Sequence, residues 1–387
     1  MPHDDPQTNA RKLHVLYLAI ISVLIVILVY VSARAVRANR TMKEVEERFG
    51  LGGDIRSSAP RDEPLREISS EGLLREKSFD EYCEEVNNLV ERASVLGDFG
   101  RGELAEACAH ALRGGKRLRS IIILEICRAA TVRARGDARE NRASLVDPAE
   151  AALFIEYLHT ASLIIDDLPA FDDDNERRGK PTVHAITNVA TAQMAALSLL
   201  AAAFQNICRQ IDWIRDNCPE FKNVDRIGTR LCHDVSMAIG AMGAAGGQIA
   251  TSTGDAQDTT RDPNAVLEIA RMKTASFFEI AFLVGWLISG ASPADATDIQ
   301  RAGRHFGLAF QIADDLGDME EDANRANRVS AVNAVNTDWN FANLYGVDEA
   351  HRRITQNLNA CRLIMQEKNI YTPIWQEIYE KVWGMAG

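Results

Sequence analysis

Two clusters of aspartates are the residues of this chain best suited to do chemistry. The clusters contain Asp166, Asp167 and Asp172–Asp174 in the first, and Asp314, Asp315 and Asp318 in the second. Clustered carboxylates repel one another, so each cluster destabilises a fold unless a cation neutralises it. Their oxygen atoms suit Mg²⁺, which typically takes one or two carboxylates together with substrate phosphates. For the first cluster taken alone, a solvated acidic loop is an equally good interpretation.

The spacing of the two clusters makes the metal-binding interpretation stronger. Each follows an apolar stretch of helical periodicity, and about 150 residues separate them. Asp314 and Asp318 are four residues apart and therefore share one helix face, whereas Asp315 lies about 100° round the helix. We expect the two apolar helices to end in carboxylates that face one another across a helical bundle, where such sites are built.

A third set of residues is cationic. Gly114-Gly115-Lys116-Arg117-Leu118-Arg119 precedes an apolar run, where glycines let the backbone approach an anion and a helix start offers free N–H groups. The other members are Arg177, Arg178 and Lys180 after the first cluster, and Lys273 with Thr274 in an apolar helix. Each group alone is typical of a solvated basic face. Together with the carboxylates they indicate a diphosphate that bridges metal ions and is closed in by Arg and Lys.

Composition limits the classes of protein to consider. The chain has 387 residues, of which 46% are hydrophobic and 25% charged, as in globular proteins. Its net charge of −12 disfavours nucleic acid as a partner, although a local basic pocket for small anions remains compatible with it. The seven cysteines are odd in number and form no CxxC pair, which predicts reduced thiols rather than a disulfide framework or a zinc knuckle.

The pattern of apolar residues predicts helices throughout the body. Ser78 and Glu81 form a capping-box sequence before an apolar helical repeat, and Asp147-Pro148 is typical of another helix start. No convincing alternating strand pattern is present. We predict one all-α domain over residues 78–387. Its further helical stretches are 189–204, 233–250, 264–289, 294–316, 349–367 and 372–384.

The N-terminal part predicts a membrane anchor. Residues 15–31 carry no charge, and the predicted span 13–33 is long enough to cross a hydrocarbon core. The alternative is a cleaved signal peptide, but the apolar run exceeds the usual length of such a segment. More Lys and Arg follow the span than precede it, which predicts a single-pass protein whose body faces the cytoplasm. Residues 1–12 then form a short tail and residues 34–77 a charged linker.

Four motifs together resemble the trans-type isoprenyl diphosphate synthases, the farnesyl, geranylgeranyl and polyprenyl diphosphate synthases. The motifs are GGKRLR, HTASLIIDDLPAFDDDNERRGKPT, MKTA and GLAFQIADDLGD, in the order of that family over roughly residues 100–320. The four residues between Asp167 and Asp172 resemble the longer first motif of bacterial farnesyl and plant-type geranylgeranyl enzymes. The resemblance implies an isoprenoid-synthase-type helical bundle around a central cavity.

The resemblance also implies a reaction and its metal ligands. Isopentenyl diphosphate would be condensed with an allylic diphosphate, with three Mg²⁺ ions as cofactors. Asp166 and Asp172 would hold two ions and Asp314 the third. Asp167 and Asp318 would support them, and Asp315 is grouped with these catalytic aspartates.

Further matches of the motifs imply the diphosphate contacts. The isopentenyl side would be formed by Gly115, Lys116, Arg119, His159 and Arg178. The allylic side would be formed by Arg177, Lys273, Thr274 and Gln311. By itself His159 is typical of a core histidine, but its position seven residues before Asp166 matches the family.

The expected chemistry needs no nucleophilic side chain. Metal ions and cations stabilise the leaving diphosphate, the isopentenyl double bond attacks the allylic cation, and a proton is lost to the released diphosphate. An apolar tunnel shields the cation from water. Short-chain members of the family have a bulky aromatic where this chain has Ala161 and Ser162. We therefore expect a product of C20, geranylgeranyl diphosphate, or longer.

Several departures from the family pattern leave alternatives open. They are Ser120, Ile165, Met194-Ala195, Thr251 and Asp338. A catalytically weak or silent, membrane-anchored partner subunit of another synthase is the first alternative, and a class I terpene cyclase is a weaker one. A homodimer is the family expectation, and the Ala-rich helix 189–204 suits close packing against a second copy.

Overall fold

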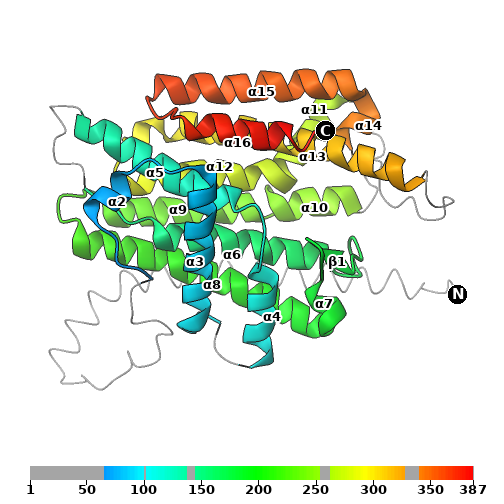
Figure 1. The fold of residues 1–387 in the computed structure, drawn as a ribbon, viewed down its shortest axis with the longest axis horizontal. Helices are drawn as coiled ribbons and strands as arrows, with labels where there is room; N and C mark the ends of the chain where they lie inside the picture. Colours follow the sequence, from blue (N-terminus) through cyan, green and yellow to red (C-terminus); the bar gives the residue numbers. More distant parts are fainter. Residues whose placement is uncertain (1–64, 100–101, 137–143, 253–261, 327–339, 387) are drawn as a thin grey trace, which may run out of the picture. The chain divides into compact units, whose positions relative to one another are not determined.

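The computed structural model describes residues 65–386 except 100–101, 137–143, 253–261 and 327–339, and side chains 320–326 are not described. Helices dominate this part of the chain (Figure 1). Their bounds are α2 (Ser70–Leu74), α3 (Phe79–Val95), α4 (Glu103–Leu112), α5 (Leu118–Gly136), α6 (Ala149–Asp166), α7 (Val183–Ile186), α8 (Val189–Asn217), α9 (Val224–Ile239), α10 (Ala244–Ser252), α11 (Pro263–Ala270), the π turn η2 (Arg271–Ala275), α12 (Ser276–Ile288), the 3₁₀ turn η3 (Pro293–Asp295), α13 (Ala296–Ala326), α14 (Phe341–Tyr345), α15 (Val347–Glu367) and α16 (Ile374–Trp383). The all-α prediction is confirmed.

Two helices form the centre of the bundle. Every residue of α12 is buried, and so is α5 from Leu118 to Thr131, which is typical of helices enclosed on all sides. Helix α5 packs against both α12 and α6, while α6 pairs with α8 and α13 pairs with α15. Figure 1 shows α15 and α16 along one side of the bundle and α8 along the opposite side. Both aspartate-bearing helices, α6 and α13, therefore belong to the layers around this centre.

The observed helix ends differ from the predicted ones at informative places. The capping box of Ser78 and Glu81 is confirmed. The predicted helix 233–250 is broken at Gly240–Gly243, and the predicted helix 264–289 contains the π turn. Helix α13 continues to Ala326, so the second aspartate cluster lies within a helix rather than after one. A two-stranded antiparallel hairpin, β1 (Glu176–Arg177) and β2 (Lys180–Pro181), was not predicted.

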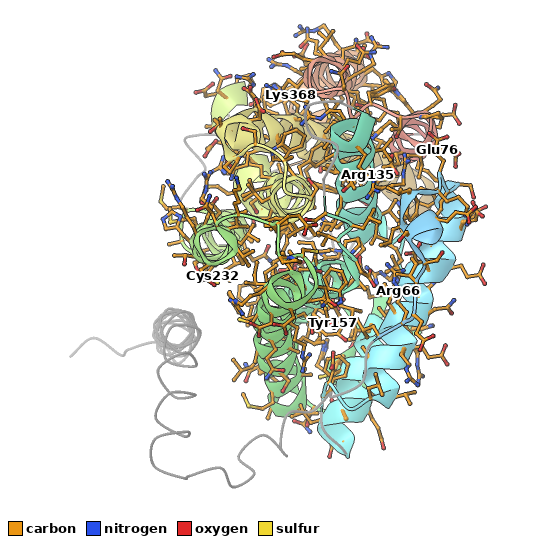
Figure 2. The ribbon with its side chains drawn as sticks, turned by 90° about the vertical axis from the view of Figure 1, so that its left-hand side faces the viewer. Arg66, Glu76, Arg135, Tyr157, Cys232 and Lys368 are labelled. Atoms are coloured by element: carbon orange, nitrogen blue, oxygen red, sulfur yellow. The ribbon has the colours of Figure 1, made fainter. Side chains whose placement is uncertain are left out.

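The folded body includes residues that the sequence analysis assigned to the linker. Ser69 caps α2, and its hydroxyl accepts from the Gly72 N–H at 3.1 Å. Arg66 donates to Asp147 at 2.6 Å and also pairs with Glu85. Figure 2 labels Arg66 on the side of the body opposite Cys232 of α9. These paired, half-buried charges attach the chain to the bundle well before residue 78.

The predicted membrane anchor, residues 13–33, lies outside the described residues. Among the described helices, α8 alone is long and apolar enough to cross a membrane, and half of its most apolar window is buried in the protein. Packing against α4 and α6 accounts for that apolar character. Helix α8 is thus part of the core.

Candidate active site

The first aspartate cluster lies at the C-terminus of α6. Asp166 is the last helical residue, and the chain then folds back so that the Asp172 N–H donates to the Asp166 carbonyl at 3.0 Å. Burial raises the pKa of Asp166 to about 6, and the negative charge of Asp172 adds to the shift, whereas the cation of Lys273 opposes it. Crowded carboxylates with a raised pKa are the expected state of a cation site before its cation arrives.

The neighbouring Asp167 is engaged differently. It is buried, and its carboxylate accepts from Arg177 Nε at 2.5 Å. Arg177 stands on the hairpin, where the adjacent Arg178 has a positive φ of 55° and Gly179 one of 72°. The pair fixes the hairpin against the end of α6.

The second cluster shows the same division between neighbours. Asp314 is exposed, whereas Asp315 is buried. The Asp315 carboxylate accepts from Gln311 Nε2 at 2.7 Å and from the Phe341 N–H at 2.8 Å. Burial raises its pKa to about 7, although these two hydrogen bonds favour the charged form. Asp315 therefore supports the start of α14, about 100° round the helix from Asp314.

Two cations connect the clusters. The charges of Lys273 and Arg177 oppose the rise in the pKa of Asp166 that burial causes. They also oppose the rise in the pKa of Asp314, which neighbouring residues partly desolvate although its side chain reaches the solvent. Asp166 and Asp314 therefore both lie within electrostatic range of the same two cations.

The π turn η2 carries Lys273 and Thr274. A Cβ on Gly247 of α10 would come within 2.5 Å of the Lys273 backbone nitrogen, and one on Gly307 of α13 within 2.5 Å of the Ala275 Cα. These two glycines let neighbouring helices close on the turn. The Thr274 hydroxyl donates to Gln311 Oε1 at 2.5 Å. Since π turns are frequent at functional sites, this irregularity agrees with the position of Lys273.

Arg119 is buried beside the second cluster. Its Nη1 lies 3.1 Å from His159 Nε2, and its Cζ lies 4.4 Å from the ring centroid of Phe278. Its Nε has no hydrogen-bond partner among the described residues. Burial lowers the pKa of Arg119 to about 10, and burial followed by the charge of Arg119 lowers the pKa of His159 well below its ordinary value. A neutral His159 thus accepts from a charged Arg119.

The cations of the sequence GGKRLR have different roles, because Arg117 stabilises the fold whereas Lys116 and Arg119 belong to the candidate site. Arg117 is buried and donates to Asn87 Oδ1 at 2.9 Å, to Glu156 Oε2 at 2.8 Å and to the Leu112 carbonyl at 2.6 Å. Ser120, a departure from the family pattern, donates to Glu156 at 2.9 Å. Sequence reasoning did not find Glu156, because a glutamate in an apolar helix gave no sign of its partner.

Lys116 and Gly115 lie in the loop before α5. Lys116 is exposed, and its charge opposes the rise in the pKa of Asp314. Gly115 has a φ of 102°, and a Cβ there would come 2.6 Å from Arg178 Nη1. Arg178 Nη1 donates to the Gly114 carbonyl at 3.2 Å. The hairpin therefore closes onto the glycine loop.

The structure also places most of the other residues that the sequence analysis named. Ala161 is buried, and the Ser162 hydroxyl donates to the His159 carbonyl at 2.8 Å, one turn before Asp166. Asp318 is exposed one turn beyond Asp314. Thr251 donates to the Gln248 carbonyl at 2.9 Å within its own helix. Asp338 lies outside the described residues.

The donor set can be compared with what a magnesium ion requires. Among the described residues, no three His, Cys, Asp or Glu side chains converge closely enough to hold a metal ion by themselves. Mg²⁺ usually takes one or two carboxylates and completes its shell with water and substrate phosphates. Single aspartates on two helices, with cations in electrostatic range of both, fit that mode of binding and do not fit a closed protein cage.

Known proteins resemble this chain over most of its length. The model of the family described as polyprenyl synthetase matches residues 101–368. A trans-prenyltransferase of African swine fever virus (isolate Tick/South Africa/Pretoriuskop Pr4/1996) is 38% identical over 374 residues, which cover 97% of this chain and 99% of the relative. A farnesyl diphosphate synthase of Geobacillus stearothermophilus is 34% identical over 256 residues, 64% of this chain and 77% of the relative.

The fold has solved counterparts. A geranyltransferase from Legionella pneumophila superposes with a TM-score of 0.62 at 21% identity, over 79% of this chain and 95% of that one. A geranyltransferase from Helicobacter pylori gives 0.60 at 21% identity, over 83% and 98%. Both are evidence for the same helical fold.

Proposed function

Because the chain belongs to the polyprenyl synthetase family and is a trans-prenyltransferase, we propose that it condenses isopentenyl diphosphate with an allylic diphosphate in a Mg²⁺-dependent reaction. The family resemblance drawn from the motifs is confirmed. The observation that carries the proposal is that the charges of Lys273 and Arg177 each act on both Asp166 and Asp314. One diphosphate, together with its magnesium ions, would interact with all four charges.

The aspartates, through magnesium ions, and the cationic side chains would bind the same leaving diphosphate. Asp166, Asp172 and Asp314 would hold the magnesium ions, three in number, and bound Mg²⁺ would neutralise charge on the departing diphosphate. Lys273 and Arg177 would contact the same diphosphate from the other side, with Thr274 and Gln311 beside them. Because these groups are positioned beforehand, they stabilise the developing charge without reorganising during the reaction.

The isopentenyl diphosphate would bind on the α5 side. Lys116, Arg119 and Arg178 supply three cations there, and Gly115 leaves the backbone open to an anion. His159, neutral, would hold Arg119 in place by accepting from it. The unpartnered Nε of the buried Arg119 supports this assignment, since an orphaned donor awaits an acceptor. The proton lost in the condensation would leave with the released diphosphate.

The proposed product is geranylgeranyl diphosphate, C20, or a longer chain. Ala161 and Ser162 present little bulk one turn before Asp166, which is where short-chain enzymes of the family have aromatic side chains. Relatives of this chain are named as farnesyl and as geranylgeranyl diphosphate synthases, so both lengths occur among them. A Ser162→Phe variant is expected to shift the product from C20 to C15.

The test of the function uses the full chain in detergent with Mg²⁺ and labelled isopentenyl diphosphate. C5, C10 and C15 allylic diphosphates are offered in turn, and the dephosphorylated products are separated by chromatography. A Mg²⁺-dependent product of C20 or longer that disappears in Asp166→Ala supports the proposal. Folded protein that yields no product with any primer supports the alternative, a silent partner subunit of another synthase.

The membrane anchor and the homodimer remain proposals with their own tests. Residues 13–33 would anchor the protein with its body in the cytoplasm, and deletion of residues 1–40 is expected to release it from membranes. The outer face of α8 would meet a second copy, since Val189 and Met194 are exposed there. Analytical ultracentrifugation of the detergent-solubilised chain is expected to show a dimer, and a Met194→Glu variant to weaken it.

A further inference from the structure

A pocket of about 400 Å³, counted with its open mouth, lies behind the first aspartate cluster. It is enclosed by α4, α6 and the β1–β2 hairpin, and we call it the hairpin pocket. Its α6 wall is formed by Thr160, Leu163, Ile164 and Asp167, which share one helix face at positions i, i+3, i+4 and i+7. Asp166, which faces the proposed active site, lies about 100° round the helix from Asp167. The pocket therefore adjoins a different face of α6 from that of Asp166, and it shares Arg177 and Arg178 with the proposed substrate contacts.

The charges around the hairpin pocket are predominantly positive. Arg113, Arg177, Arg178 and Lys180 line it, against Asp167 as the one carboxylate among its lining residues. Asp167 is already paired with Arg177 at 2.5 Å. Arg113 and Lys180 make no ion pair within the described part of the chain. Like charges gathered without counter-ions attract an anion, most strongly in a concave site.

A buried hydroxyl supplies an independent sign of a ligand. Thr160 lines the pocket and is only 2% exposed, yet its Oγ1 has no hydrogen-bond partner among the described residues. An unmade hydrogen bond at a buried polar atom costs about 1–3 kcal/mol, and a bound acceptor removes that cost. The remaining floor is apolar and includes Leu163, Ile164 and Val183. The lining thus suits a small molecule with an anionic head and an apolar part.

The pocket is built from several elements held together. His110 Nε2 of α4 lies 2.8 Å from the Pro181 carbonyl of β2, and this contact joins α4 to the hairpin. The Thr182 hydroxyl donates to the Asp174 carbonyl at 2.8 Å, which also fixes the open end of the hairpin. Pre-formed walls reduce the entropy that a ligand must lose on binding.

We propose that the hairpin pocket binds a diphosphate-bearing molecule without a metal ion, and that this binding inhibits the adjacent active site. The inhibitory part rests on the proposed function. Arg177 and Arg178 form the wall between the two sites, so an anion in the pocket competes for the guanidinium groups that would hold the substrates. Inorganic diphosphate and a prenyl diphosphate share the anionic group, and the apolar floor distinguishes them.

The binding test uses the full chain in detergent with EDTA, so that metal-bridged binding is suppressed. Isothermal titration is performed with inorganic diphosphate and with geranyl thiolodiphosphate. We expect the Arg113→Gln/Lys180→Gln double variant to bind both at least tenfold more weakly, as expected for the loss of charge-assisted hydrogen bonds. Thr160→Val keeps the side-chain shape, and we expect it to lower the affinity for both compounds about threefold to tenfold.

The matched control is Lys222→Gln/Arg226→Gln, which removes two exposed cations near the start of α9. Unchanged affinity in this control supports the proposal. An equal loss of affinity in both double variants overturns it, because the binding is then a non-specific attraction to positive charge. Tighter binding of the geranyl compound identifies a prenyl diphosphate as the occupant. Equal binding of both compounds identifies the diphosphate group alone.

Activity measurements distinguish a failure of this proposal from a failure of the proposed function. If the chain is an active synthase, the single Arg113→Gln variant keeps its initial rate within twofold at low substrate and resists inhibition by inorganic diphosphate. Lys116→Gln removes an exposed cation of the proposed isopentenyl site that does not line the hairpin pocket, so it is expected to retain metal-free binding. Loss of metal-free binding in Lys116→Gln would place the anion at the isopentenyl site and overturns the proposal, whether or not the wild-type chain is active.

Discussion

The two aspartate clusters differ in the partners of their second aspartate, which is Asp167 in the first cluster and Asp315 in the second. At the end of α6, Asp167 is occupied by an arginine of the hairpin, Arg177. Within α13, Asp315 is occupied by Gln311 and by a backbone N–H of α14. In both clusters the first aspartate, Asp166 or Asp314, lies within electrostatic range of Lys273 and Arg177.

This difference shows that adjacent aspartates on a helix cannot do the same work. Neighbouring side chains lie about 100° apart, so the two aspartates of a pair point to different sides of the helix and meet different partners. The first cluster uses its second aspartate to position a cation of the site. The second cluster uses its second aspartate to start another helix. A motif of two aspartates therefore combines a ligand with a support, and the two supports have different consequences.

The largest expected effects belong to Asp166 and Asp314, the first aspartate of each cluster. Asp166→Asn and Asp314→Asn each remove a proposed metal ligand and keep the side-chain shape. We expect each to lower kcat about 10³-fold, the size found when a group that stabilises developing charge is lost. The measurement is the initial rate with labelled isopentenyl diphosphate over a range of Mg²⁺ concentrations. Unequal effects on the Mg²⁺ dependence would show that the clusters hold their ions differently.

Asp167→Asn is expected to have a smaller effect, about 10–100-fold on activity, because it acts through Arg177. The loss should appear mainly in the KM for the allylic diphosphate if Arg177 contacts that substrate. Steady-state kinetics with each substrate varied in turn will check this. Thermal stability serves as the control, and a loss confined to stability would contradict a positioning role.

Asp315→Ala is expected to act on stability before activity. It removes the acceptors of the Phe341 N–H and of Gln311, and a buried donor left unsatisfied costs about 1–3 kcal/mol. Chemical denaturation followed by circular dichroism measures the change in the free energy of unfolding. Asp315→Asn retains one carbonyl acceptor and should lose less. If Asp315→Asn abolishes turnover while leaving stability intact, Asp315 is a ligand and the comparison between the clusters fails.

The residue types and order of the site could be predicted from the sequence, but their division of labour could not. Two aspartate-bearing helices and three cationic groups follow from periodicity and spacing, and cations of all three groups act electrostatically on Asp314. The partner of Asp315 is a backbone N–H 26 residues along the chain. The buried pair of Arg117 and Glu156 joins two helices that have no local signal of contact. Such contacts depend on tertiary packing, which a residue pattern does not encode.

The fold shows the same limit at its irregular points. Helices with a strong apolar repeat were predicted correctly in type, whereas the π turn around Lys273 and the hairpin around Arg178 were not. Both irregular elements carry cations of the site. The π turn depends on the close approach of Gly247 and Gly307 from other helices. The hairpin has only two residues in each strand, too few for an alternating pattern.

The last comparison concerns the arginine nearest each cluster. Arg177 is neutralised by a carboxylate, whereas Arg119 is held by His159, whose pKa is lowered well below its ordinary value by burial and by that arginine. A histidine that stays neutral leaves the full charge of Arg119 available to an anion. Arg119 should therefore bind an isopentenyl diphosphate more strongly than an arginine already paired with an aspartate.

This arrangement makes stability depend weakly on pH, with a definite sign. Above about pH 6.5, His159 is neutral in the folded and the unfolded chain and contributes no slope. As the pH falls below that value, the unfolded chain gains a proton that the folded chain refuses, so the free energy of unfolding decreases. His159→Gln should remove this part of the slope between pH 6.5 and 5.5, measured by denaturation at each pH. A charged His159 ring in the NMR spectrum at pH 6.5 would contradict the neutral pair, and Arg119 would then be no freer than Arg177.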